Sequence, residues 1–185
     1  NKIIPYHYDK YAQCPERYEM VTTNCLTGKA CYYEEKNNPQ RIIDIVRASS
    51  SLPFVCPIAY VDGIPMLDGG ITNSIPLLRA QNEGFTENNV VVLTRNRGYR
   101  KQIKGTKVPP FIYRKYPLLR EAINNRSKLY NEQLDLVERL EDEGRITVIR
   151  PQLPIEVDRI EKNIDKLTAL YEEGYQLADG IRFEL

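Results

Sequence analysis

Short apolar runs alternate along this chain with longer stretches whose apolar residues recur at helical spacing. The runs at 90–93 and 146–149 are typical of strands, and we expect the first to be buried on both faces. Between them, residues 117–143 carry apolar side chains three, four or seven positions apart, which predicts a long helix ended by Gly144. The alternation predicts an α/β fold, a layered and mostly parallel sheet flanked by helices, with long C-terminal helices.

Turn and capping residues divide the first half of the chain. Residues 18–26 and 30–33 are expected to be two paired strands. A helix is expected from Asn37 or Asn38, with Pro39 in its first turn, to about Ala48. Its core face is expected to consist of Ile42, Ile43, Ile45 and Val46.

Turn and capping residues further along the chain predict a hairpin and two more helices. Asp62-Gly63 is a strong hairpin signal between short strands at 58–61 and 65–67. A helix with Pro76 in its first turn follows, ending near Gly84. Its expected cap is Asn73 or Ser74. The final amphipathic helix is marked by Val157, Ile160, Ile164, Leu167 and Tyr171.

Composition narrows the class of protein. The 185 residues suit one domain or slightly more, and 26 basic against 25 acidic side chains argue against a dedicated nucleic-acid binder. No apolar run approaches the roughly 20 residues that span a bilayer, and no secretory segment is visible. The four cysteines have no zinc-type spacing, so we expect reduced thiols, a cytoplasmic location and no metal.

Basic and acidic residues are unevenly distributed. Residues 95–120 hold nine Lys or Arg and no acid, whereas residues 132–185 hold fourteen acids against seven bases. One interpretation is solvated faces, or two surfaces that complement each other. The other is a loop that contacts an anionic surface such as phospholipid headgroups. Its candidate residues are Arg95, Arg97, Arg100, Lys101 and Lys104.

One carboxylate, that of Asp68, is expected at the end of a strand, a position where catalytic groups are common. Asp68 closes a short strand, and Gly69 and Gly70 follow it. Glycine permits unusual backbone angles and close approach, and a carboxylate fixed at a strand end can act as a general base. The alternative is a structural Asp-Gly turn. His7 is the only histidine, so a base in this chain is not expected to be histidine.

The ordered set of motifs around Asp68 resembles the second half of bacterial patatin-like phospholipases. The matching pieces are Ser49-Ser50-Ser51-Leu52-Pro53, Val61-Asp62-Gly63, Asp68-Gly69-Gly70, Asn73 and Ile75-Pro76. The segment from Val148 to Tyr175 resembles a C-terminal extension of bacterial members. The resemblance implies that residues 1–115 are the C-terminal part of a hydrolase domain and that residues 116–185 are an extension.

That resemblance implies lipid acyl-ester hydrolysis by a Ser-Asp dyad, with Asp68 as the base, Gly69 and Gly70 as the active-site turn, and no cofactor. In the family the serine lies in G-x-S-x-G, which this sequence lacks. We therefore expect the nucleophile half upstream of Asn1, and this chain alone to be inactive. Ser49, Ser50, Ser51 and Ser74 lie on no glycine-flanked turn and are not expected to replace it.

Two other functions remain open from the sequence. One is a non-catalytic interaction domain, for which the long helix and the basic stretch would be the surfaces. The other is binding to anionic lipid without hydrolysis, peripheral at a membrane. Because loss of sheet strands would expose apolar edges, self-association is also expected.

Overall fold

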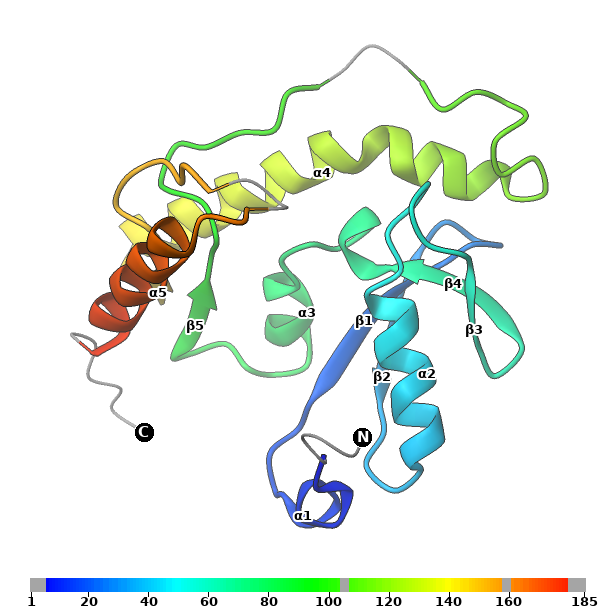
Figure 1. Ribbon diagram of the computed structural model, residues 1–185, viewed down its shortest axis with the longest axis horizontal. Helices are drawn as coiled ribbons and strands as arrows, with labels where there is room; N and C mark the ends of the chain where they lie inside the picture. The colour runs from blue at the N-terminus through cyan, green and yellow to red at the C-terminus, as the bar shows by residue number, and fades with distance from the viewer. Residues whose placement is uncertain (1–5, 104–106, 158–160, 180–185) are drawn as a thin grey trace. The chain divides into compact units, whose positions relative to one another are not determined.

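The computed structural model describes residues 6–103, 107–157 and 161–179 (Figure 1). These residues form an α/β structure that divides into two compact units. Unit 1 comprises residues 1–75 and 102–130, and unit 2 comprises residues 76–101 and 131–185. A domain boundary after residue 115 stays a prediction.

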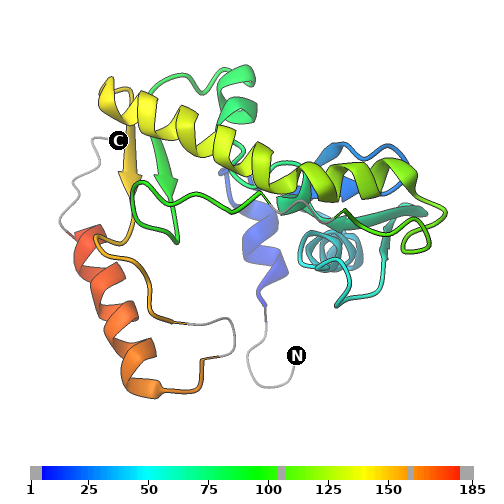
Figure 2. The same ribbon diagram turned by 90° about the horizontal axis from the view of Figure 1, so that it is seen from above.

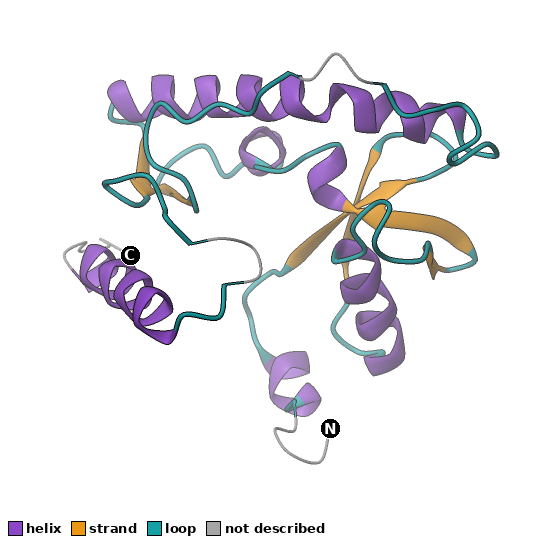
Figure 3. Cartoon of the chain, turned by 45° about the horizontal axis from the view of Figure 1, so that its top comes forward, coloured by secondary structure: helices purple, strands orange, loops and turns teal. Residues whose placement is uncertain are grey.

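The main sheet of unit 1 has four antiparallel strands in the order β2-β1-β4-β3 (Figure 3). The strands are β1 (Glu19–Asn24), β2 (Ala30–Glu34), β3 (Ala59–Val61) and β4 (Ile64–Asp68). The expectation of a mostly parallel sheet was wrong. Two strand pairs are joined by short turns, and such connections permit only antiparallel neighbours. The helix between β2 and β3 links two hairpins, so it is no crossover between parallel strands.

Local residues build these hairpins as predicted. Asp62 and Gly63 have φ of 52° and 77°, the left-handed geometry of a tight hairpin turn between β3 and β4. Gly28, at φ 65°, lies in the connection between β1 and β2. A short helix, α1 (Tyr8–Gln13), precedes the sheet.

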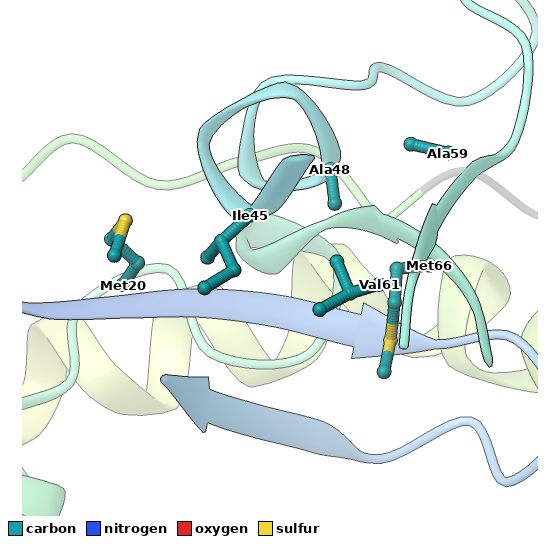
Figure 4. Close-up of a cluster of buried hydrophobic side chains, with 6 residues drawn as sticks. All are labelled: Met20, Ile45, Ala48, Ala59, Val61 and Met66. Atoms are coloured by element: carbon teal, nitrogen blue, oxygen red, sulfur yellow. The ribbon is translucent and has the colours of Figure 1, made fainter. Parts of the chain in front are cut away.

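The helix α2 (Pro39–Ser49) packs on this sheet through one stripe. Its N-terminal cap is Asn38, one of the two residues predicted for this position. The Asn38 side chain accepts a hydrogen bond from the Arg41 N–H at 3.1 Å. Ile45 and Ala48 belong to a buried cluster with strand residues (Figure 4). The predicted core face was too wide, since Ile43 and Val46 are exposed. The cluster consists of Met20, Ile45, Ala48, Ala59, Val61 and Met66.

A second buried cluster joins the end of β4 to the first half of α4 (Pro117–Asp142). It contains Leu67 of β4, Ile71 of the 3₁₀ turn η1 (Gly69–Ile71), and Leu119 and Ala122 of α4. All four side chains are at most 8% exposed. The helix that is distant in sequence therefore packs beside the Asp68-Gly69-Gly70 turn.

Unit 2 holds a pair of parallel strands, β5 (Asn89–Val92) and β6 (Ile146–Ile149), which lie side by side in Figure 2. The prediction that residues 90–93 are buried on both faces was wrong, because Val90 and Val92 are exposed. Val91 is buried between these two residues, and successive side chains of a strand point to opposite faces, so β5 has one buried and one exposed face. Gly144, at φ 67°, ends the long helix as predicted.

Two helices of unit 2 differ from expectation. α3 (Leu77–Asn82) has Pro76 at its cap position and no side-chain cap, because Ser74 bonds elsewhere. α5 (Ile164–Asp179) begins later than the apolar pattern suggested and buries no side chain. Of the residues expected to mark it, Ile160 lies outside the described residues.

Candidate active site

Asp68 is held by backbone contacts at the end of β4. It pairs in register with Thr22 of β1, and its N–H donates to the Ser51 carbonyl at 2.9 Å. Its carbonyl accepts from the Thr23 hydroxyl at 2.9 Å, and Thr23 is fully buried. The Asp68 side chain is only half-buried. The backbone of this carboxylate is therefore fixed while its oxygens stay accessible.

The two glycines that follow have different structural roles. The Gly70 N–H donates to Asp68 Oδ1 at 2.7 Å and so orients the carboxylate. Gly69 is buried against β1, where an added Cβ would lie 2.3 Å from the Val21 carbonyl oxygen. No side chain fits there, so Gly69 allows the turn to lie directly on the neighbouring strand.

Three polar side chains converge on Gly70. An added Cβ at this residue would lie 2.9 Å from Asp68 Oδ1, 3.5 Å from Ser74 Oγ and 3.6 Å from an Arg126 Nη atom. The Gly70 carbonyl accepts from Ser74 Oγ at 2.8 Å and from Arg126 Nε at 2.8 Å. A carboxylate, a hydroxyl and a guanidinium thus share one small site.

Sequence reasoning missed Arg126, which reaches Gly70 from α4. Arg126 lies seven residues after Leu119 and four after Ala122, on the same helical stripe as these buried residues. A charged residue on a buried stripe was the signal available in the sequence. Within the described residues, no carboxylate lies within ion-pair distance of its guanidinium.

Two of the four serines weighed as nucleophiles, Ser51 and Ser74, donate their hydroxyls to backbone carbonyls. The Ser51 hydroxyl donates to the Arg47 carbonyl at 2.7 Å and is 4% exposed. Ser49 ends α2, and Ser50 is its C-terminal cap. Ser74 lies in the site, but its hydroxyl donates to a carbonyl rather than to a base. A nucleophile needs a base that accepts its proton, so none of these serines has that arrangement.

The remaining sequence-predicted residues form no part of this site. His7 is exposed at the start of α1. The cysteines are free thiols, and burial raises the pKa of Cys25 to about 12, which makes it unreactive.

Two arginines of the basic stretch are neutralised by acids of α4 in unit 2. Arg97 pairs with Glu141 and Asp142, at 3.2 and 2.7 Å. Arg100 pairs with Asp135 and with another acid of the same helix. The interpretation as complementary surfaces therefore holds for these two arginines.

The other candidates for an anionic surface have different environments. The Arg95 guanidinium lies over the Tyr99 ring, 5.1 Å from its centroid. The Lys101 backbone exchanges two hydrogen bonds with the Asn131 side chain. Lys104 lies outside the described residues. Contact of these residues with an anionic surface stays a prediction.

Glu138 is held in this network by two hydrogen bonds. Its oxygens accept from Arg100 at 2.7 Å and from the Gly98 N–H at 3.0 Å. The hydrogen bond from Arg100 lowers the pKa of Glu138 from 4.5 to about 2. Because the pKa is lower in the folded state, the pair stabilises the fold above pH 4.5 and the stabilisation is lost as pH falls through 2.

We expect Glu138→Gln to lower the free energy of unfolding by on the order of 2 kcal/mol at pH 7. The difference from the wild type should shrink as pH approaches 2, in denaturant titrations at several pH values. The control is Asp142→Asn, which removes an exposed carboxylate paired with the same stretch and should change stability little. Equal effects of the two variants, or no dependence on pH, would contradict this assignment.

Comparison with known families separates the chain into two parts. Residues 27–80 match the Patatin-like phospholipase family. Residues 116–181 match a domain of unknown function, DUF6363. No curated protein matches the chain. The patatin-like match includes Asp68, Gly69 and Gly70, and the second match covers most of the segment expected to be a C-terminal extension.

Patatin-like phospholipases are serine hydrolases of lipid acyl esters, so the match implies a lipid substrate. Within the described residues, no helix is long and apolar enough to cross a membrane. Arg126 lies outside the patatin-like match and inside the second one. Its bond to Gly70 links the two matched segments within unit 1.

Proposed function

We propose that Asp68 is the general base of a Ser-Asp dyad that hydrolyses lipid acyl esters. The observation that carries the proposal is the fixed backbone and accessible carboxylate of Asp68 inside the patatin-like match. A general base must be held in place and must reach the proton that it removes. The bond from the Gly70 N–H to Oδ1 aims the carboxylate, and the other oxygen has no partner among the described residues.

The nucleophile is a serine outside residues 1–185. Support comes from the serines near Asp68, whose hydroxyls donate to backbone carbonyls. Its Oγ attacks the ester carbonyl while Asp68 accepts the serine proton. Asp68 then gives this proton to the oxygen of the breaking ester bond, and the alcohol leaves. Water then attacks the acyl-serine, releases the fatty acid and restores the serine hydroxyl. Asp68 removes a proton from this water and returns it to the serine oxygen.

The natural protein is expected to release fatty acid from phosphatidylcholine that is dispersed in detergent micelles. Residues 1–185 alone are expected to release none, because they supply the base without the serine. Liquid chromatography with mass detection of free fatty acid is the measurement. Release by residues 1–185 would contradict the proposed position of the nucleophile, and no release by the natural protein would contradict the function.

A further inference from the structure

Two loops of unit 1 expose large apolar side chains. Phe54 and Val55 follow α2, and Phe111 precedes α4; their exposed fractions are 58%, 78% and 78%. The Phe54 N–H donates to the Tyr113 hydroxyl at 2.9 Å, and the two rings lie 5.7 Å apart. The loops are therefore joined, so that their apolar residues belong to one part of the unit.

The backbone holds this arrangement at some cost. Phe54 and Tyr113 have φ of 69° and 51°, in the left-handed region that aromatic residues rarely adopt. Turn bonds from Ile112 to Pro109 and from Tyr116 to Tyr113 fix the second loop. Strained residues that persist in an ordered loop are typical of functional surfaces.

Cations without a carboxylate partner flank Phe111 in the sequence. Lys107, Arg114 and Lys115 are exposed and lie within four residues of Phe111. In the part of the chain that the structure describes, none of the three has a carboxylate within 4.0 Å. The nearest acid that follows in the sequence is Glu121. This half of the basic stretch thus differs from Arg97 and Arg100, whose charges are neutralised.

We propose that these residues dock the protein on an anionic lipid bilayer. The docking face is defined as Phe54, Val55, Phe111, Lys107, Arg114 and Lys115. Exposed apolar side chains together with uncompensated Lys and Arg on the same joined loops match a bilayer, because the apolar groups enter the acyl boundary while the cations contact anionic headgroups.

The docking face adjoins the candidate active site. The loop that carries Phe54 and Val55 begins at Ser51, whose carbonyl accepts from the Asp68 N–H at 2.9 Å. Seating this loop on a bilayer therefore places lipid close to the Asp68 strand end. Binding itself requires no turnover, so this inference goes beyond the proposed function and can fail separately from it.

The test is co-sedimentation of the protein with vesicles of phosphatidylcholine and phosphatidylglycerol at a 3:1 ratio in low salt. We expect Val55→Asp with Phe111→Asp to lower vesicle binding by at least about tenfold, because charged groups cannot enter the acyl boundary. Arg114→Gln with Lys115→Gln should lower it about 30-fold, since each cation near an anionic surface contributes roughly a fivefold affinity. High salt should weaken wild-type binding.

Matched controls locate the effect. Leu153→Asp places the same charge at a side chain that is 74% exposed in unit 2, and it should bind as the wild type does. Arg95→Gln with Lys101→Gln removes the same two charge types from the stretch predicted by the sequence. If the wild-type protein sediments equally with and without vesicles, it does not bind them and the proposal is wrong. Equal losses from both charge pairs, or from Leu153→Asp and the double aspartate variant, would contradict the docking face.

Discussion

The Asp68→Asn variant of the natural protein is expected to hydrolyse phospholipid about 10³-fold more slowly than the wild type. Asparagine keeps the shape of the side chain and can still accept from the Gly70 N–H through its amide oxygen. It has no basicity, so it cannot take the serine proton. The measurement is initial rate of fatty acid release at saturating substrate, together with a thermal melt.

The matched control is Asp62→Asn. Asp62 is also an aspartate of an Asp-Gly turn, but it lies in the turn between β3 and β4, at the opposite end of β4 from Asp68, and its carboxylate pairs with Arg41 at 2.9 Å. Asparagine tolerates its left-handed backbone, so turnover should stay near the wild-type value. If Asp68→Asn keeps full activity with a normal melt, Asp68 is a structural turn residue.

The Gly69→Ala variant is expected to lose about 3 kcal/mol or more of its free energy of unfolding. The new Cβ would lie 2.3 Å from the Val21 carbonyl oxygen and 2.8 Å from the Val21 Cβ, inside the central strand β1. Neither β1 nor the turn can shift without breaking the pairing of Thr22 with Asp68. Denaturant titration of purified protein measures the loss.

Gly70→Ala gives the informative contrast within the same motif. Its Cβ would meet Asp68 Oδ1 at 2.9 Å, the end of a side chain that can rotate away. We therefore expect a nearly normal melt and a large loss of turnover, because the carboxylate is displaced. Gly174→Ala, with open space around its Cβ, controls for the substitution itself. Equal stability of Gly69→Ala and Gly174→Ala would contradict the packing argument.

Residues with local signals were predicted well from the sequence. Asn38 and Pro39 start α2, the Asp62-Gly63 pair makes its hairpin, and Gly144 ends α4. Each of these depends on φ or on a single side-chain bond to the nearby backbone. The prediction of a mostly parallel sheet was wrong because strand direction depends on how the strands are connected and paired. The alternation of helices and strands in the sequence does not specify this pairing.

The site was predictable only in part for the same reason. Asp68 carries a motif with its neighbours, so it could be selected from sequence. Arg126 contacts Gly70 from 56 residues away, and its place depends on how α4 packs on the turn. The basic stretch looked uniform, yet Arg97 and Arg100 meet acids of α4 whereas Arg114 does not. Such pairing arises from tertiary structure.

The most direct test of the Ser-Asp account is intact-mass measurement of the natural protein after treatment with a fluorophosphonate, followed by peptide mapping. The account predicts one adduct, on a serine outside residues 1–185, and much slower labelling in Asp68→Asn. An adduct on any serine within residues 1–185, or no adduct on an active protein, would contradict it.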